Sequence, residues 1–190
     1  MLKIAHRINT VAQLKEISPN FGIELDIRSE GNNLILHHDP FSKGELFEDL
    51  LKVYKQKFII LNTKEEGMEE SILALMEKYQ IENYFFLDLS LPFLVKHARL
   101  GLKKIAVRYS EYEPIEFALS FAGKVDWLWI DCFNDLPLNQ DNYKQLKQHF
   151  KLCLVSPELQ GYSTDRIKEF KNQINGMEID AVCTKRPDLW

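Results

Sequence analysis

The sequence predicts an α/β protein, a compact (β/α)8 barrel in which residues 1–190 form a single domain. Short apolar runs recur along the chain, and near-continuous apolar runs are typical of parallel strands that are buried on both faces. Segments with helical periodicity separate these runs, as the crossover connections of a parallel barrel require. No Gly-rich nucleotide-binding loop follows any run, so an open doubly wound sheet is the second choice.

The predicted strands are the eight apolar runs, and they are short. They comprise residues 2–5, 22–27, 58–61, 84–87, 104–107, 127–130, 152–155 and 179–182. A further run, residues 33–37, follows the second strand after only a few residues. We expect it to form a small excursion at the mouth of the barrel, where the loops after the strands gather.

Helices are expected between the strands. Apolar residues at helical spacing predict several of them, among them residues 46–54, 68–79 and 167–174. Thr10 and Gln13 have the spacing of a capping box for the first helix. Ser163 or Thr164 can cap the last helix, and Pro114 suits the first turn of the fifth.

Composition excludes several classes of protein. The formal net charge of −4 and the lack of a long basic run argue against a nucleic-acid partner. No apolar stretch is long enough for a membrane span, and the N-terminus does not resemble a secretion signal, so we expect a cytoplasmic protein without stable membrane insertion. The three cysteines have no metal-binding or disulfide spacing, and we expect them to be buried. The oligomeric state is not indicated.

The second predicted strand carries two carboxylates, Glu24 and Asp26, in an otherwise apolar pattern. Side chains alternate along a strand, so both carboxylates project from the same face. Burial of two ionised groups without a partner costs several kcal/mol each, and a divalent cation would offset that cost. The pair therefore indicates a cation site.

In a barrel, the functional residues come from the carboxyl ends of the strands. Every predicted strand of this chain places polar side chains there. The candidate site residues are His6, Arg7, Glu24, Asp26, His38, Asn62, Lys64, Arg108, Asp131, Glu158 and Lys185.

Four short motifs carry a family resemblance. They are IAHR at the first strand, ELD at the second, LHHDP shortly after it and NTK at the third. In this order they resemble the HRG, ExD, HD and ExK pattern of the glycerophosphodiester phosphodiesterase family, whose members are TIM barrels. Later stretches, such as FFLDLSLPF and WLWIDCFN, are similar to a small bacterial subgroup described as phospholipase-C-like.

The resemblance implies a phosphoric diester hydrolase with a role in lipid metabolism. It implies that His6 and His38 are the acid/base pair, because two imidazoles can move protons near neutral pH. A substrate hydroxyl would attack phosphorus and give a cyclic intermediate. The substrate would be a small phosphodiester of the glycerophosphodiester or sugar-phosphodiester type.

The resemblance also assigns the charged residues. Glu24 and Asp26, with Asn62, would bind a divalent metal, Mg²⁺ or Ca²⁺, and Arg7 and Lys64 would hold the phosphate. Arg108, Asp131, Glu158 and Lys185 are further candidates for substrate binding.

The chain departs from the family pattern at three places. Ile8 stands where the family has the glycine of HRG. Asn62 replaces the third acidic ligand, which removes one negative charge from the metal site. Lys185 and Arg186 stand where the family commonly has an acid, and this favours a substrate with a second anionic group.

Alternatives remain open from the sequence. Glu24 and Asp26 could form a structural salt-bridge network with Arg7, Lys64 and Arg108, in a barrel that has lost catalysis. The protein could also be a non-catalytic barrel that binds a phosphorylated sugar or a lipid headgroup through Arg7, Lys64, Arg108 and Lys185. Asp131 and Glu158 could be substrate ligands or interior ion pairs.

Other polar and aromatic residues have simpler interpretations. His37 is expected to point away from its neighbour His38, while His97 and His149 are expected on helix surfaces. Trp127 and Trp129 are expected in the core.

Overall fold

The computed structural model describes residues 1–190, and each of the eight predicted strands is present in it. Six strands lie within one or two residues of the prediction or extend it, whereas β7 and β10 begin two residues later. The strands are β1 Leu2–Ala5, β2 Gly22–Glu30, β5 Ile59–Thr63, β6 Tyr84–Leu87, β7 Ala106–Tyr109, β8 Trp127–Ile130, β9 Lys151–Val155 and β10 Ala181–Thr184.

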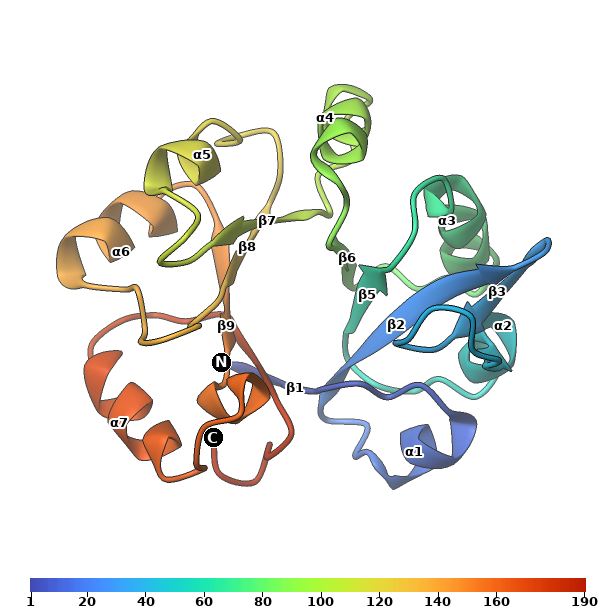
Figure 1. Ribbon diagram of the computed structural model, residues 1–190, viewed down its shortest axis with the longest axis horizontal. Coiled ribbons are helices and arrows are strands. Elements are labelled where there is room, and N and C mark those ends of the chain that lie inside the picture. Colours follow the sequence, from blue (N-terminus) through green and yellow to red (C-terminus); the bar gives the residue numbers. More distant parts are fainter. The chain divides into compact units, whose positions relative to one another are not determined.

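Helices alternate with these strands along the chain (Figure 1). They are α1 Val11–Glu16, α2 Phe47–Leu51, α3 Glu69–Lys78, α4 Leu91–Arg99, α5 Ile115–Leu119, α6 Gln140–Lys147, α7 Arg166–Gln173 and a 3-10 helix, η1, Pro157–Gln160. The capping box of Thr10 and Gln13 is confirmed. The prediction for α7 was wrong, because Asp165 is its N-cap and the Ser163 hydroxyl binds the backbone and carboxylate of Asp165 instead.

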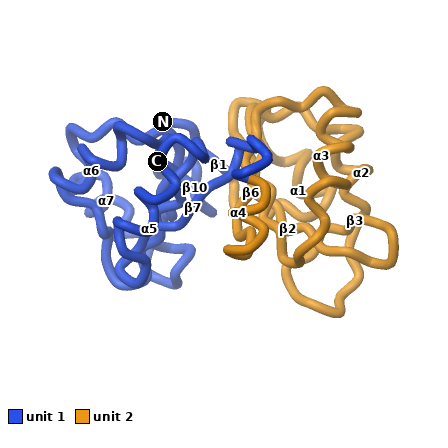
Figure 2. The backbone as a smooth tube through the Cα atoms, turned by 90° about the horizontal axis from the view of Figure 1, so that it is seen from above, with its two compact units in different colours: residues 1–4, 98–190 blue, residues 5–97 orange.

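The chain divides into two compact units, shown in different colours in Figure 2. Unit 2 comprises Ala5–His97. In it, β2 pairs in parallel with β5, and β5 pairs with β6. The register places Asp26 beside Asn62, so the motif residues of two strands become neighbours.

The predicted excursion after the second strand is a small antiparallel element in unit 2. β3 Asn33–Leu36 pairs with the carboxyl half of β2, and β4 Glu45–Leu46 pairs with β3. Gly44 packs so closely on the Leu36 carbonyl that an added Cβ would overlap it. The loop between β3 and β4 is therefore held against the strand that precedes it.

Unit 1 comprises Met1–Ile4 and Ala98–Trp190. Its strands β7, β8, β9 and β10 pair in parallel in that order, and the backbone N–H of Leu2 donates to the Asp180 carbonyl at 2.7 Å. The three cysteines and both tryptophans of β8 are buried, as predicted.

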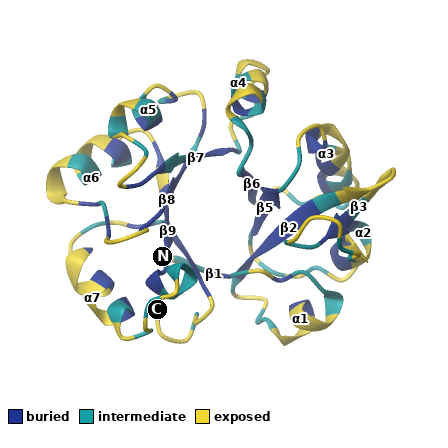
Figure 3. Cartoon of the chain, in the orientation of Figure 1, coloured by how far each residue is buried: buried dark blue, intermediate teal, exposed yellow.

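In each unit the parallel strands are largely buried and the outer faces of the helices are exposed, whereas β4 and the tip formed by β2 and β3 are exposed (Figure 3). One helical residue corrects the sequence prediction. His97 is only 3% exposed, and its Nε2 lies 3.7 Å from Glu69 Oε2 at the start of α3. Glu69 lies 28 residues earlier in the sequence, so the local pattern around His97 could not show this contact. None of the helices has the length and apolar character needed to span a bilayer.

Candidate active site

Glu24 and Asp26 lie on β2 and are each only 1% exposed. Because they are two residues apart on a strand, both carboxylates project from the same face, as predicted. Residues from the two adjoining motifs surround them. The sequence motifs of β1, β2 and β5 thus converge on one buried pair of carboxylates.

Glu24 accepts hydrogen bonds at both carboxylate oxygens. The backbone N–H of Arg7 donates to Oε2 at 2.7 Å, and Asn62 Nδ2 donates to Oε1 at 2.9 Å. Burial and, to a lesser extent, the neighbouring charge of Asp26 raise the pKa of Glu24 to about 7, although these hydrogen bonds and Lys64 oppose the shift. The folded protein therefore favours the protonated form of Glu24.

Asp26 is the point where the cationic side chains meet. Lys64 Nζ lies 3.1 Å from Asp26 Oδ1, and Arg7 Nε lies 3.7 Å from Oδ2. Asn9 Nδ2 donates to Oδ2 at 2.8 Å. Lys64 Nζ is also 3.7 Å from Asp88 Oδ2, so this ammonium lies between two carboxylates.

The loop after β1 brings His6 and Arg7 to the carboxylates. Arg7 has a positive φ of 59°, which is uncommon for a residue other than glycine. This conformation points its backbone N–H at Glu24, while its side chain stays 45% exposed. His6 Nε2 lies 3.7 Å from Glu24 Oε2. The residue with the positive φ is Arg7 and not Ile8. The backbone at Ile8 therefore does not require the glycine that the family has there.

His38 lies on the loop that follows β3. Its Nδ1 is 2.8 Å from Asp39 Oδ1, and this hydrogen bond holds the pKa of the Asp39 carboxyl below its usual value. Arg28 donates from Nε and Nη2 to the His38 carbonyl, at 3.1 and 2.9 Å. Both the ring and the backbone of His38 are therefore held in place.

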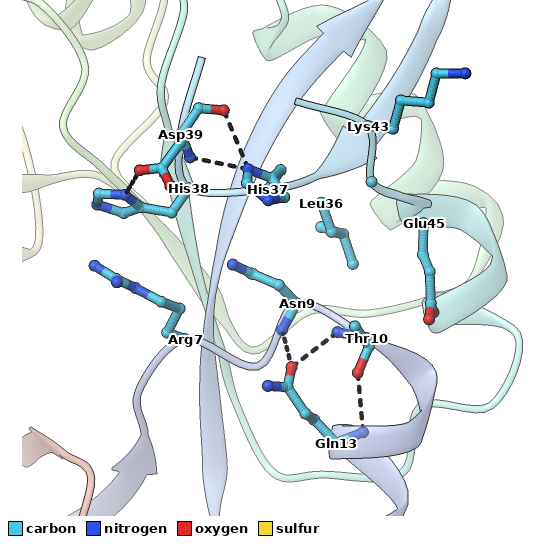
Figure 4. Close-up of a pocket in the computed structure, with 11 residues that line it drawn as sticks. Arg7, Asn9, Thr10, Gln13, Leu36, His37, His38, Asp39, Lys43 and Glu45 are labelled. Carbon is cyan, nitrogen blue, oxygen red and sulfur yellow. Dashed lines mark hydrogen bonds and ion pairs between the residues drawn. The ribbon is translucent and has the colours of Figure 1, made fainter. Parts of the chain in front are cut away.

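A pocket of about 570 Å³ joins His38 to the loop after β1. The loop after β1 lines one part of it with Arg7 and Asn9. The loop between β3 and β4 lines another part with His37, His38 and Lys43 (Figure 4). His37 also lines this pocket, and its Nδ1 contacts the backbone of Asp39. The prediction that His37 points away from the site was therefore wrong, because the chain turns after Leu36 and strand alternation no longer applies.

The residues around Glu24 and Asp26 can be tested for their fit to a divalent metal. Residues 1–190 contain no group of three His, Cys, Asp or Glu side chains that could hold a metal ion. However, Asn62 Oδ1 is buried and accepts no hydrogen bond, while Nδ2 of the same carboxamide donates to Glu24. A rotation of the carboxamide by 180° would turn the oxygen toward that carboxylate. Two carboxylates and an amide oxygen are ligands that Mg²⁺ and Ca²⁺ accept. The set fits a divalent cation, with one charge fewer than three carboxylates would give.

The local charge supports the same conclusion. Three carboxylates, those of Glu24, Asp26 and Asp88, face two cationic side chains, Arg7 and Lys64. With Glu24 ionised, negative charge is in excess, and a phosphodiester anion would be repelled. A bound divalent cation would reverse the sign of the net charge.

Four predicted site residues belong to unit 1. Arg108 Nη1 binds Asp131 Oδ2 at 2.9 Å, and Trp129, Gln160 and the Cys132 N–H also donate to Asp131. Glu158 accepts from the hydroxyls of Ser156 and Thr184 and from the N–H of the exposed Lys185. Asp131 and Glu158 thus have intramolecular partners, and substrate binding by these four residues stays a prediction.

Sequence reasoning missed Asn9 and the role of Asp88. Asn9 lies next to the capping Thr10 and looks like part of a helix start, so no local signal marks it. Asp88 follows β6 and has a φ of 62°. Its unusual backbone conformation and its proximity to Lys64 are visible only in three dimensions.

The fold of this chain is similar to that of proteins with solved structures, whereas its sequence as a whole does not match known families. No model of a known protein family matches the chain, and no curated protein sequence matches it. Solved structures do match over nearly all of its length. A protein assigned as a glycerophosphoryl diester phosphodiesterase from Agrobacterium tumefaciens C58 has a TM-score of 0.72 and 12% identity, covering 100% of this chain and 95% of that one.

Two other similar structures come from different organisms. A glycerophosphoryl diester phosphodiesterase from Parabacteroides distasonis has a TM-score of 0.66 and 12% identity, covering 99% of this chain and 84% of that one. A mutant tryptophan synthase α-subunit from Pyrococcus furiosus has a TM-score of 0.59 and 10% identity, covering 98% and 88%.

These similarities confirm the fold class. The glycerophosphodiester phosphodiesterase structures are TIM barrels, so the chain is an α/β protein with the (β/α)8 fold, and the open doubly wound sheet is excluded. The resemblance carried by the four motifs is thereby confirmed at the level of the fold. Identities of 10 to 12% mark a divergent sequence, and a fold of this kind supports many activities.

Proposed function

We propose that this protein is a phosphodiesterase that cleaves a small phosphodiester of the glycerophosphodiester or sugar-phosphodiester type. One observation carries the proposal. His6, Arg7 and Lys64, which come from two separate motifs, all lie within 4 Å of the buried carboxylates of β2. A salt-bridge network alone would not need a histidine next to a carboxylate whose pKa is raised.

In this proposal, Arg7 and Lys64 bind the phosphate oxygens and hold the substrate in place. A hydroxyl of the substrate attacks phosphorus. One of His6 and His38 takes the proton of that hydroxyl, and the other gives a proton to the oxygen that leaves. The products are a cyclic phosphodiester, which water later opens, and an alcohol.

Glu24, Asp26 and the Oδ1 of Asn62 hold a divalent metal, Mg²⁺ or Ca²⁺, in the same proposal. When bound, the metal supplies positive charge that neutralises the phosphodiester and the charge that develops during its cleavage. The buried, unpaired Oδ1 of Asn62 and the raised pKa of Glu24 support this assignment.

A second candidate function is a non-catalytic barrel that binds a phosphorylated sugar or a lipid headgroup. The amide of Asn62 favours it, because that side chain donates to Glu24 and brings no negative charge for a metal. In this case Arg7 and Lys64 would bind the phosphate group, and no bond would be cleaved.

Hydrolysis of glycerophosphoethanolamine, which carries a hydroxyl beside the phosphodiester, separates the two functions when ethanolamine release is measured in the presence of Mg²⁺ or Ca²⁺. We expect turnover by the wild type and a loss of about 100-fold or more in kcat for His38→Ala, since a positioned acid or base contributes at least that factor. His149→Ala is the control, because it removes an exposed histidine that lies outside the pocket, in unit 1. Equal activity of His38→Ala and wild type, or no turnover by a wild type that binds phosphate, would favour the binding protein.

A further inference from the structure

Asn9 contacts Asp26 at two points. Its Nδ2 donates to Asp26 Oδ2 at 2.8 Å, and its Oδ1 accepts the backbone N–H of Asp26 at 2.8 Å. A carboxamide that binds the backbone and the carboxylate of the same residue fixes both the position and the rotation of that carboxylate. No motif of the sequence marks Asn9 for this role.

We propose that Asn9 is a positioning residue, which acts through Asp26 to hold Arg7 and Lys64 in the arrangement that binds a phosphate group. This inference rests on the proposed function. Asp26 Oδ1 faces Lys64 Nζ at 3.1 Å, and Oδ2 faces Arg7 Nε at 3.7 Å. The orientation of a single carboxylate therefore sets the relative placement of two cations.

The loop that carries Asn9 is anchored on both sides. The Ile8 N–H donates to the Glu24 carbonyl at 2.8 Å, and Gln13 Oε1 accepts the N–H of Asn9 at 2.9 Å. Ile8 thus binds β2 at Glu24, and the Asn9 side chain binds it two residues further on, at Asp26. Beyond the end of β1, the side chain of Asn9 thus replaces a backbone partner for β2. It binds the Asp26 carboxylate at the same time.

The chemistry of this position explains why it is an asparagine. Aspartate would place a second negative charge against Asp26 Oδ2 and would lose the donor. Serine is too short to reach both atoms, and alanine reaches neither. Only a carboxamide of this length offers an acceptor to the backbone and a donor to the carboxylate.

The test compares Asn9→Ala with Asn139→Ala. Asn139 is the N-cap of α6, where its Oδ1 accepts from the N–H groups of Asp141 and Asn142 at 2.9 and 3.0 Å. The control removes the same side chain from another anchored helix start. Both variants lower the midpoint of thermal unfolding. Asn9→Ser is a milder change that covers the case in which Asn9→Ala does not fold.

Two binding readouts separate positioning from stability. We expect Asn9→Ala to raise KM for glycerophosphoethanolamine, and Kd for inorganic phosphate measured by calorimetry in the presence of Mg²⁺, each by about tenfold. Its kcat should change less than about threefold, because the histidines are untouched. Asn9→Ser should raise both constants by a smaller factor, and Asn139→Ala should leave both unchanged.

The opposite results overturn the inference. Asn9 variants that keep the wild-type KM and phosphate Kd, or that lose only kcat in proportion to the unfolded fraction, would show a purely structural role. A wild type that binds phosphate without turnover would refute the proposed function alone, because the phosphate Kd still tests Asn9. A wild type that neither turns over substrate nor binds phosphate would refute both.

Discussion

Both units hold carboxylates on a strand or shortly after one, but they surround them differently. Glu24, Asp26 and Asp131 are buried, and Glu158 is half-buried. In unit 2, Glu24 and Asp26 share one face of a single strand, and the cationic side chains of Arg7 and Lys64 lie beside Asp26. In unit 1, Asp131 and Glu158 come from different segments, and each accepts at least three hydrogen bonds. These bonds come from Arg108, Trp129, Gln160 and Cys132 for Asp131, and from Ser156, Thr184 and Lys185 for Glu158.

This difference distinguishes a carboxylate that holds the fold together from one that is available to a ligand. A single buried charge with several fixed donors is stabilised where it is. Burial of Glu24 and, to a lesser extent, repulsion by the neighbouring charge of Asp26 raise the pKa of Glu24. A ligand cation would relieve this repulsion in unit 2, whereas unit 1 has no comparable deficit of positive charge at Asp131.

The largest expected effect is on the pH dependence of stability. The folded state raises the pKa of Glu24 from 4.5 to about 7, so it favours the protonated form. The stabilisation is complete below pH 4.5 and is lost as the pH rises through about 7. It amounts to about 3 kcal/mol in the free energy of unfolding. Urea unfolding in EDTA from pH 4.5 to 8 should show this loss in the wild type and not in Glu24→Gln.

Divalent cations sharpen the same experiment. Mg²⁺ or Ca²⁺ binds the ionised carboxylates and should restore part of the stability lost at pH 8. If the free energy of unfolding in EDTA changed equally with pH in wild type and Glu24→Gln, the two units would not differ in this way. Ionisation of Glu24 would then cost the folded state no stability.

The second largest effect is expected when a carboxylate of unit 1 is changed to an amide, the same change that Glu24→Gln makes in unit 2. Asp131→Asn should lower the free energy of unfolding by about 2 kcal/mol, because an amide group would face donors that now bind the carboxylate. Glu24→Gln should not lower it at pH 8, since the Asn62 carboxamide can rotate by 180° and turn its unpartnered Oδ1 toward the new amide. Equal losses for the two variants, measured by urea unfolding, would remove the distinction.

The smallest effect concerns the missing carboxylate of the metal site. Asn62→Glu adds a third acidic ligand beside Glu24 and Asp26, and we expect it to lower Kd for Mg²⁺ or Ca²⁺ by about tenfold or more. Isothermal titration calorimetry measures this directly. An unchanged Kd would place any cation away from β5, and no binding by either protein would remove the metal from the proposal.

Much of the fold could be predicted from the sequence. Strands β6 and β8 have the predicted bounds, and the capping box of α1 is present, because each depends on a few neighbouring residues. The starts of β7 and β10 are shifted by two residues. Their flanking lysine and acidic residues do not mark where pairing with the next strand begins, since register depends on the partner strand.

Some of the candidate site residues could be predicted from the sequence, and others could not. Order and spacing indicated His6, Arg7, Glu24, Asp26 and Lys64, and the structure brings these five together. The side chain of Asn9, the inward position of His37 and the burial of His97 could not be predicted. Each depends on a loop path or on a helix that packs from another part of the chain.

By itself, the sequence determined that apolar runs become strands and that the carboxylates of Glu24 and Asp26 share a face, because alternation is a local property of the backbone. Only the tertiary structure decided which groups those carboxylates meet. Partners such as Asn9 and Asn62 reach them through strand register and loop conformation, and these are set by contacts between residues far apart in the chain.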